Sequence, residues 1–276
     1  MAPRGDHMTI RTFCVSMLLL TIGGRAQTQP PMAPQTPPVG PSCTELASAI
    51  RAVVSNDARL KDWPNLARYR QANRTVAESA TRVVFMGDSI TDFWQQPRFG
   101  GFFPGKPYAD RGISGQTTPQ MLARFRADVI DLHPDVVVIL AGTNDIAGNT
   151  GPLTNEETEG NLASMSELAQ AHHIKVVLAS VTPVSAAHVP SPTAVPETTQ
   201  RPPARIQAIN AWLKAYADAH GHIYLDYFTA MADLDGLLRA DLSADDLHPN
   251  AKGYLIMAPL AEAAIQTALK APSPRL

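Results

Sequence analysis

Short, uninterrupted apolar runs alternate with helical patterns along most of this 276-residue chain. The clearest apolar run reads Asp-Val-Val-Val-Ile-Leu-Ala at 135–141, further runs lie at 83–86, 175–180 and 222–225, and a more polar strand is predicted at 107–113. Helical patterns lie at 119–132, 154–173, 205–220 and 253–270. Strands without polar alternation are typical of sheets buried on both faces, and parallel strands need long, usually helical connections. The pattern therefore predicts an α/β protein whose five-stranded parallel sheet is covered by helices on both faces.

The most informative junction lies at the end of the first run. Residues 82–91 read Arg-Val-Val-Phe-Met-Gly-Asp-Ser-Ile-Thr, so an apolar strand breaks at Gly-Asp-Ser and a helix-compatible stretch follows. This pattern places the hydroxyl of Ser89 at the carboxyl end of a strand, where open α/β sheets bind ligands. Because Gly, Asp and Ser favour any turn, the junction alone is a weak indication of catalysis.

Two downstream segments offer what a serine nucleophile needs. A serine hydroxyl is a poor nucleophile unless a base takes its proton and fixed donors receive the oxyanion. Residues 245–249, Asp-Asp-Leu-His-Pro, offer His248 as the base with a carboxylate three residues before it. Residues 142–145, Gly-Thr-Asn-Asp, follow a predicted strand and offer the amide of Asn144. Taken singly, the first segment is also compatible with an acid-rich helix cap and the second with a simple turn.

The chain resembles the SGNH or GDSL hydrolase family through four motifs in the family's order. The first, at residues 87–90, reads Gly-Asp-Ser-Ile and differs from the eponymous sequence only by Ile for Leu. The others are a glycine, an asparagine and an Asp-x-x-His motif, matched here by Gly115, by Asn144 and by Asp245 with His248. The resemblance implies a flavodoxin-like three-layer α/β/α sandwich with strand order 2-1-3-4-5 and a serine esterase site along its carboxyl edge.

The chemistry of acyl transfer gives each motif a role. Ser89 is expected to attack an ester carbonyl and form an acyl-enzyme, with His248 as general base and then general acid. Asp245 and Asp246 compete to orient the imidazole. The family pattern and the i, i+3 spacing favour Asp245, and Asp246 is expected to be a surface or turn carboxylate.

The oxyanion formed in this reaction needs donors that are fixed beforehand. The candidates are the backbone N–H groups of Ser89 and Gly115 and the side-chain amide of Asn144. Because Gly115 has no Cβ, its backbone can approach a substrate closely. Phe93 and Trp94 follow the nucleophile by one helical turn and could line an acyl pocket, although core packing is expected for at least one of them.

Composition divides the chain into four parts. A short apolar core after Arg11, followed by small residues, is the layout of a secretory signal peptide that starts at Met1 or Met8. A stretch rich in Pro and Gln then predicts an extended linker. The predicted parts are a signal peptide at 1–26, a linker at 27–42, a helical extension packed on the domain at 43–80, and the catalytic domain at 81–271.

Two segments outside the motifs also carry expectations. In the extension, Trp63, Leu66 and Tyr69 have helical spacing, which predicts that they pack on the domain. Residues 183–203 form a long, Pro-rich connection between a strand and a helix. Such a loop is usually functional or disordered, so it is either a lid or wall over the site or a passive surface insertion.

Charge and cysteine content exclude several classes of protein. The net charge is −2, and no basic stripe of the kind that binds nucleic acid is present. Beyond the predicted leader, which contains Cys14, only Cys43 remains, so an internal disulfide is not expected. No histidine spacing suggests a metal site, and no other apolar segment suggests a stable membrane anchor. We expect a bacterial periplasmic or secreted protein without metal or cofactor.

The sequence therefore predicts a carboxylic-ester hydrolase acting on small or short-chain acyl esters, O-acetyl groups of carbohydrates among them. A lysophospholipase or acetylhydrolase acting on lipid esters is the nearest alternative, and an acyltransferase would use the same acyl-enzyme. A catalytically silent carbohydrate-binding protein is the alternative from a different class, because a fold alone does not decide function. The sequence leaves the oligomeric state unknown.

Overall fold

The structure is a computed structural model and describes residues 42–77, 82–188, 191 and 193–271. The predicted signal peptide and the predicted linker up to residue 41 lie outside the described residues. The division into leader, linker, extension and catalytic domain stays a prediction.

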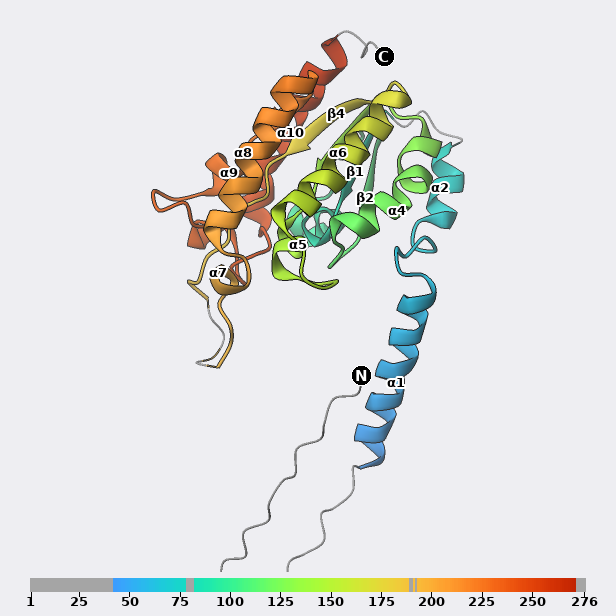
Figure 1. The fold of residues 1–276 in the computed structure, drawn as a ribbon, viewed down its shortest axis with the longest axis vertical. Coiled ribbons are helices and arrows are strands. Elements are labelled where there is room, and N and C mark those ends of the chain that lie inside the picture. Colours follow the sequence, from blue (N-terminus) through green and yellow to red (C-terminus); the bar gives the residue numbers. More distant parts are fainter. Residues whose placement is uncertain (1–41, 78–81, 189–190, 192, 272–276) are drawn as a thin grey trace, which may run out of the picture. The chain divides into compact units, whose positions relative to one another are not determined.

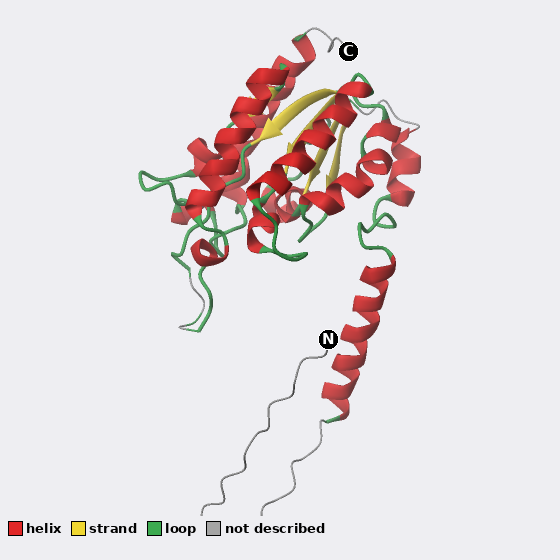
Figure 2. Cartoon of the chain, viewed as in Figure 1, coloured by secondary structure: helices red, strands yellow, loops and turns green. Residues whose placement is uncertain are grey.

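Five strands form a single parallel sheet, shown in Figures 1 and 2. They are β1 (Val83–Gly87), β2 (Tyr108–Gly112), β3 (Val136–Leu140), β4 (Lys175–Ala179) and β5 (Ile223–Leu225). Their order in the sheet is β2-β1-β3-β4-β5, and every neighbouring pair is parallel. The predicted five-stranded sheet and its strand order are confirmed, and each strand begins and ends within one residue of its predicted bounds.

Helices precede, connect and follow these strands along the described part of the chain. They are α1 (Cys43–Lys61), α2 (Arg70–Ala77), α3 (Ser89–Asp92), α4 (Thr118–Asp128), α5 (Thr143–Ala147), α6 (Asn155–Ala171), α7 (Glu197–Gln200), α8 (Pro203–His220), α9 (Tyr227–Met231) and α10 (Ala251–Lys270). The helix predicted at 119–132 is shorter than expected, because Val129 leaves the helical conformation and a separate 3₁₀ turn follows at Ile130–Leu132.

Alternate residues of each strand pack into two separate cores. Val84 and Met86 of β1 pack on one side of the sheet with residues of α4, α6 and α8. Val83 and Phe85 pack on the other side with residues of α9 and α10. Because both faces are covered, the strands can be apolar throughout, and this confirms the three-layer arrangement expected from the sequence.

The parallel register brings the carboxyl ends of three strands to the same level. Gly87 at the end of β1 pairs with Gly112 of β2 and with Leu140 of β3. The connections from β1 and β3 leave towards opposite sides, which makes the space between these two strands the switch point at which such sheets bind ligands. Residues that follow β1, β2 and β3 therefore meet at one edge of the sheet.

The segment between α1 and α2 differs from its prediction. Trp63, Leu66 and Tyr69 lie in turns, and the helix ends before them because Pro64 lacks a backbone N–H and disfavours helical geometry in the residue before it. Trp63 is 42% exposed and Leu66 is 38% exposed. Only Tyr69 is buried, and its hydroxyl donates to the carbonyl of Gly112. The expectation that all three side chains pack on the domain is therefore wrong for the first two.

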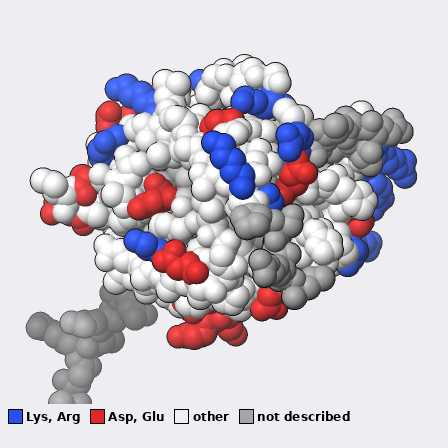
Figure 3. Space-filling view, turned by 90° about the horizontal axis from the view of Figure 1, so that it is seen from above, with Lys and Arg blue, Asp and Glu red and all other residues white. Residues whose placement is uncertain are grey.

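Within the described part of the chain, no helix combines the length and the apolar character that crossing a membrane would require. On the face drawn in Figure 3, acidic and basic side chains lie interspersed among uncharged ones.

Candidate active site

Ser89 is the first residue of α3 and follows β1 after a single intervening residue. The tight turn explains the residues before it. A Cβ at Gly87 would lie 2.1 Å from Oγ1 of Thr91, so only glycine allows the helix to start this close to the strand. Asp88 caps the helix by accepting the backbone N–H of Ile90 at 2.9 Å. The junction places the Ser89 side chain, whose residue is 6% exposed, at the carboxyl edge of the sheet.

His248 connects Ser89 to a carboxylate. Its Nε2 atom lies 2.9 Å from Oγ of Ser89, and its Nδ1 atom lies 2.8 Å from Oδ2 of Asp245. The backbone N–H of His248 also donates to Oδ1 of Asp245 at 2.8 Å. Since an ionised carboxylate can only accept, the proton resides on Nδ1, and Nε2 is free to accept the serine proton.

The surroundings of Asp245 keep it ionised. Burial alone would raise the pKa of Asp245, but hydrogen bonds from the side chain and backbone of His248 outweigh it and hold that pKa below its ordinary value. The hydroxyl of Ser243 and the backbone N–H of Leu247 donate to Oδ1 as well, at 3.0 and 3.2 Å. An ionised Asp245 can therefore stabilise the imidazolium that would form when His248 accepts a proton.

Asp246 has a different environment from the one predicted. It is 3% exposed and has φ +68°, so its side chain is directed away from that of its neighbour. Its carboxylate accepts Oγ of Ser185 at 2.6 Å, the backbone N–H groups of Ala187 and His188 at 3.1 and 2.7 Å, and Nδ1 of His188 at 3.0 Å. Asp246 is therefore a buried anchor for the loop at 183–203: it lies in a turn, as one of the two expected alternatives had it, but it is not a surface carboxylate.

The candidate oxyanion donors come from the next two strand ends. Gly115 follows β2 with φ +81°, a conformation that favours glycine, and Asn144 lies in the first turn of α5 after β3. Nδ2 of Asn149 donates both to the carbonyl of Gly115 at 3.1 Å and to Oδ1 of Asn144 at 3.0 Å. Nδ2 of Asn144 donates to the carbonyl of Gln116 at 3.0 Å. These bonds fix the Asn144 amide, and its second N–H is available for a substrate oxygen.

Arg124 supports the same edge of the sheet through hydrogen bonds, and its role was not predicted from the sequence. It is fully buried, and it donates to Oε1 of Gln116 at 2.6 Å and to the carbonyl of Gly87 at 3.0 Å. Asp128 balances its charge at 2.9 Å. The signal in the sequence was an arginine that directly precedes Phe125 on the apolar face of a predicted helix.

The loop at 183–203 has a second anchor at its other end. Arg201 is 5% exposed, and it donates to Oγ1 of Thr143 at 3.1 Å and to Oδ1 of Asn144 at 3.4 Å, while it also pairs with Glu197. The loop is thus tied to both ends of the candidate site, which favours the wall over the passive insertion. It flanks a cavity of about 280 Å³, lined among others by Val195 and Asp245.

Phe93 and Trp94 have separate environments. The ring of Phe93 lies 4.9 Å from that of His248, so this side chain contacts the candidate site. Trp94 is 3% exposed and packs against Phe85 and Tyr254 inside the core. This corrects the interpretation of Trp94 as a pocket residue: consecutive residues of a helical turn point in different directions, and Trp94 faces the sheet.

Two buried carboxylates lie near the site: Asp88 caps α3, and Asp145 accepts hydrogen bonds from the first residue of α4. Burial raises the pKa of Asp88 to about 6. Burial also raises the pKa of Asp145, whose carboxylate accepts the backbone N–H of Thr118 at 3.0 and 3.1 Å. Among the residues that the structure describes, no group of three or more His, Cys, Asp or Glu side chains could hold a metal ion.

A parallel α/β sheet with a Ser–His–Asp relay and polar donors at its carboxyl edge defines a serine ester hydrolase. Comparison with known proteins gives the family: the chain belongs to the GDSL-like lipase/acylhydrolase family, whose model matches residues 85–256.

Individual relatives agree with this assignment. A solved structure of a GDSL-like lipase from Bacteroides thetaiotaomicron is 42% identical, covers 74% of this chain and 98% of its own, and superposes with a TM-score of 0.66. An acetylxylan esterase of Geobacillus stearothermophilus is 26% identical over 211 residues, which are 65% of this chain and 91% of the esterase. The uncharacterized lipoprotein YqeF of Bacillus subtilis is 36% identical over 76 residues, and this match spans only 31% of YqeF and 26% of this chain.

Proposed function

We propose that the protein hydrolyses short-chain carboxylic esters, O-acetyl groups of carbohydrates among them, through an acyl-enzyme on Ser89. The observation that carries the proposal is the continuous relay in which Ser89, His248 and Asp245 are joined by contacts of 2.9 and 2.8 Å. A catalytically silent binding protein has no use for a relay of this kind, and it is the weaker alternative.

In the acylation step, Oγ of Ser89 attacks the ester carbonyl while Nε2 of His248 takes the hydroxyl proton. The C=O bond opens into an oxyanion, which accepts hydrogen bonds from the backbone N–H groups of Ser89 and Gly115 and from the amide of Asn144. The imidazolium of His248, held by Asp245, then gives its proton to the leaving alkoxide. The C–O bond to the alcohol breaks, and the acyl group stays on Ser89.

In the deacylation step, the same groups act on water. Nε2 of His248 takes a proton from the water molecule, whose oxygen attacks the acyl carbonyl and restores the oxyanion. Collapse of this intermediate releases the carboxylic acid and returns the proton to Ser89. An alcohol in place of water would give acyl transfer, and this stays an alternative outcome of the same chemistry.

The name of one relative supports a small acyl group. The acetylxylan esterase of Geobacillus stearothermophilus aligns with 65% of this chain, and its name gives acetyl esters of a carbohydrate as its substrate. Hydrolysis of lipid esters stays the alternative named from the sequence. Secretion or a periplasmic location also stays a proposal, and it rests on residues 1–26.

Ser89→Ala provides the test. We expect hydrolysis of p-nitrophenyl acetate to fall by at least about 10⁴-fold, because the nucleophile is lost, and the fold to be retained. Ser191→Ala, at an exposed serine of the loop, is the matched control and should keep wild-type activity. An organophosphate should label Ser89 alone in the wild-type protein. Substantial activity in Ser89→Ala, or labelling of another serine, would contradict the proposal.

A further inference from the structure

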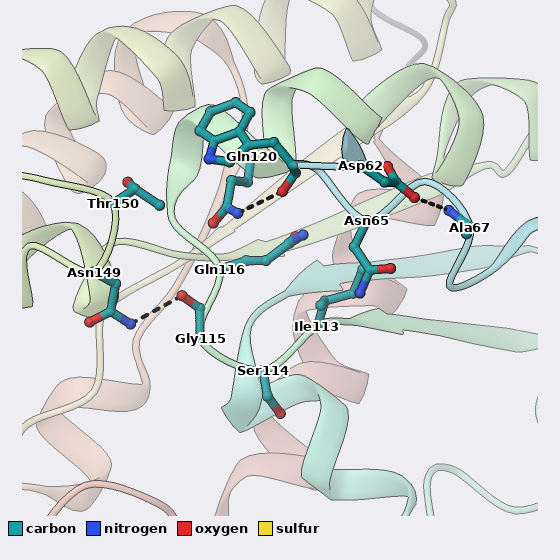
Figure 4. Close-up of a pocket in the computed structure, with 11 residues that line it drawn as sticks. Asp62, Asn65, Ala67, Ile113, Ser114, Gly115, Gln116, Gln120, Asn149 and Thr150 are labelled. Carbon is teal, nitrogen blue, oxygen red and sulfur yellow. Dashed lines mark hydrogen bonds between the residues drawn. The ribbon is translucent and has the colours of Figure 1, made fainter. Parts of the chain in front are cut away.

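A cavity of about 870 Å³ opens beside the loop at 113–116, which contains the candidate oxyanion donor Gly115 (Figure 4). Gly115 belongs both to its lining and to that loop, and Asn149, which lines it too, donates to the Gly115 carbonyl. The remaining walls come from 62–67 and 113–120. A ligand in this cavity would therefore lie directly next to the position of the substrate carbonyl.

The wall at 62–67 is a turn held by the side chain of Asp62. The carboxylate of Asp62 accepts the backbone N–H groups of Leu66 and Ala67 at 2.8 and 2.9 Å, and Figure 4 shows the second of these bonds. Asn65 stands in the left-handed region at φ +56°. The segment thus forms a closed turn that does not depend on its exposed side chains.

Two glutamines connect this turn to the opposite wall of the cavity, at 113–120, which contains Gly115. Nε2 of Gln120 donates to the carbonyl of Trp63 at 2.8 Å, and Nε2 of Gln116 donates to the carbonyl of Pro64 at 2.8 Å. Both bonds end on backbone atoms, so they survive any change of the Trp63 side chain. The indole of Trp63 is therefore held on a rigid support.

The indole itself is free to meet a ligand. Trp63 is 42% exposed, and among the described residues no ring stacks on it and no atom accepts its N–H. A large aromatic ring with a polar N–H offers a flat apolar face and one donor. Trp63 therefore has the properties of a stacking platform in the wall of the cavity.

The polar groups of the cavity restrict the chemistry of that ligand. Asp62 is the only charged side chain among its lining residues, all of which the structure describes, and it offers an acceptor. The side-chain amide of Asn65 and the oxygen of the Asn149 amide have no partner within the described part of the chain. A phosphate group would need a cation, and a long acyl chain would need an apolar lining. Stacking and neutral hydrogen bonding together suit a sugar ring.

We propose that this cavity binds the saccharide that carries the ester, with Trp63 stacked on a pyranose ring and Asp62, Asn65 and Asn149 bonded to its hydroxyl groups. The inference rests on the proposed ester hydrolysis at Ser89. The wall at 62–67 precedes residues 85–256, so it lies outside the part of the chain that the family model matches.

Trp63→Ala separates sugar binding from catalysis. On acetylated xylotriose, acetylated cellobiose and an acetylated methyl glucoside, we expect kcat/KM to fall at least about ten-fold, mainly through KM, as the loss of one stacking contact requires. On p-nitrophenyl acetate, which has no sugar, kcat/KM should stay within about two-fold of wild type. Trp63→Phe keeps a flat ring and should recover most of the activity on the saccharides.

Val195→Ala is the matched control, because Val195 is an exposed apolar residue that lines the separate cavity of about 280 Å³ next to Asp245. It should affect all substrates alike. A selective loss on saccharides in Val195→Ala but not in Trp63→Ala would overturn the proposed site. A preference for lysophosphatidylcholine over every acetylated saccharide, or equal losses on all substrates in Trp63→Ala, would overturn it as well. Failure of Ser89→Ala to abolish turnover would instead overturn the proposed function.

Discussion

Two adjacent carboxylates each hold a histidine, yet the two pairs have different surroundings. Asp245 lies 2.8 Å from Nδ1 of His248, and Asp246 lies 3.0 Å from Nδ1 of His188. The carboxylate of the first pair is 56% exposed and that of the second is 4% exposed. In the first pair the other imidazole nitrogen reaches Ser89 at 2.9 Å, whereas Nε2 of His188 bonds to none of the described residues. An Asp–His contact is therefore a poor guide to catalysis unless the far nitrogen meets a nucleophile.

The backbone explains how neighbours reach opposite partners. Asp246 has φ +68°, which directs its side chain away from that of Asp245 and towards the start of the loop at 183–203. Asp245 instead closes a short turn with the backbone N–H of His248. In the proposed mechanism the first pair positions a proton acceptor, while the second fixes the start of the loop at 183–203.

Asp245→Asn should have the largest effect in this comparison. The amide can donate a hydrogen bond to Nδ1 and thereby favour the wrong imidazole tautomer, so we expect kcat for p-nitrophenyl acetate to fall roughly 10³–10⁴-fold. The melting temperature should change little, because the side chain is half-exposed. Steady-state kinetics and a thermal melt measure both quantities. A loss of less than about ten-fold would mean that the two pairs do not differ as described.

Asp246→Asn should act on stability instead of on the chemical step. Oδ2 of Asp246 accepts the backbone N–H of His188, and an amide nitrogen at that position would leave a buried donor unpaired. We expect the free energy of unfolding to fall by about 1–3 kcal/mol, with kcat within about ten-fold of wild type. Urea unfolding beside the same kinetic assay would reveal the effect. A larger kinetic loss than in Asp245→Asn would transfer the orienting role to Asp246.

Asp110 shows what happens to a buried carboxylate without a histidine. Burial raises the pKa of Asp110 to about 7, above the ordinary 3.8, so the folded protein binds this proton more tightly than the unfolded chain. Its contribution to stability therefore falls as the pH rises from about 4 to about 7. Relative to wild type, Asp110→Asn should gain about 3 kcal/mol of unfolding free energy between pH 5 and pH 8. Chemical denaturation at the two pH values tests this, and an unchanged difference would contradict it.

His188→Ala should have the smallest effect. The side chain is 39% exposed, and its loss leaves Asp246 with three other donors, from Ser185 and from the backbone of residues 187 and 188. We expect a loss of less than about 1 kcal/mol in unfolding free energy and nearly unchanged kcat. The parallel His248→Ala variant should lose nearly all activity. Similar losses in the two variants would remove the distinction between the pairs.

The sheet and the residues of the relay were accessible from the sequence because their signals are local. Most strands are runs of apolar residues between turn signals, and the strand order was implied by the resemblance of the motifs to the SGNH or GDSL family. Ser89, Gly115 and Asn144 lie two, three and four residues past the end of a strand, so their meeting at one edge follows from the parallel register. Asp245 and His248 are three residues apart, and one turn brings them together.

The supporting contacts could not be predicted in the same way. Arg201 and Asn144 are 57 positions apart, and His188 and Asp246 are 58 apart. No periodicity links such residues, because their contact depends on how two loops pack on the finished sheet. Trp63 shows that local spacing can also mislead. Its spacing predicts a buried helical face, but Pro64 and the turn at Asp62 place it in a cavity wall.

By itself, the sequence determined the α/β class and the chemical groups available at the carboxyl edge, because hydrophobic periodicity and short-range spacing act within one element. The strand order came from the resemblance of its motifs to a known family. Only the tertiary structure decided that Asp246 is a buried anchor, that Trp94 belongs to the core and that Trp63 lines a cavity beside Gly115. Those outcomes depend on backbone direction at single residues, such as φ +68° at Asp246, and on packing between distant segments. Neither quantity is encoded in the local pattern of residues.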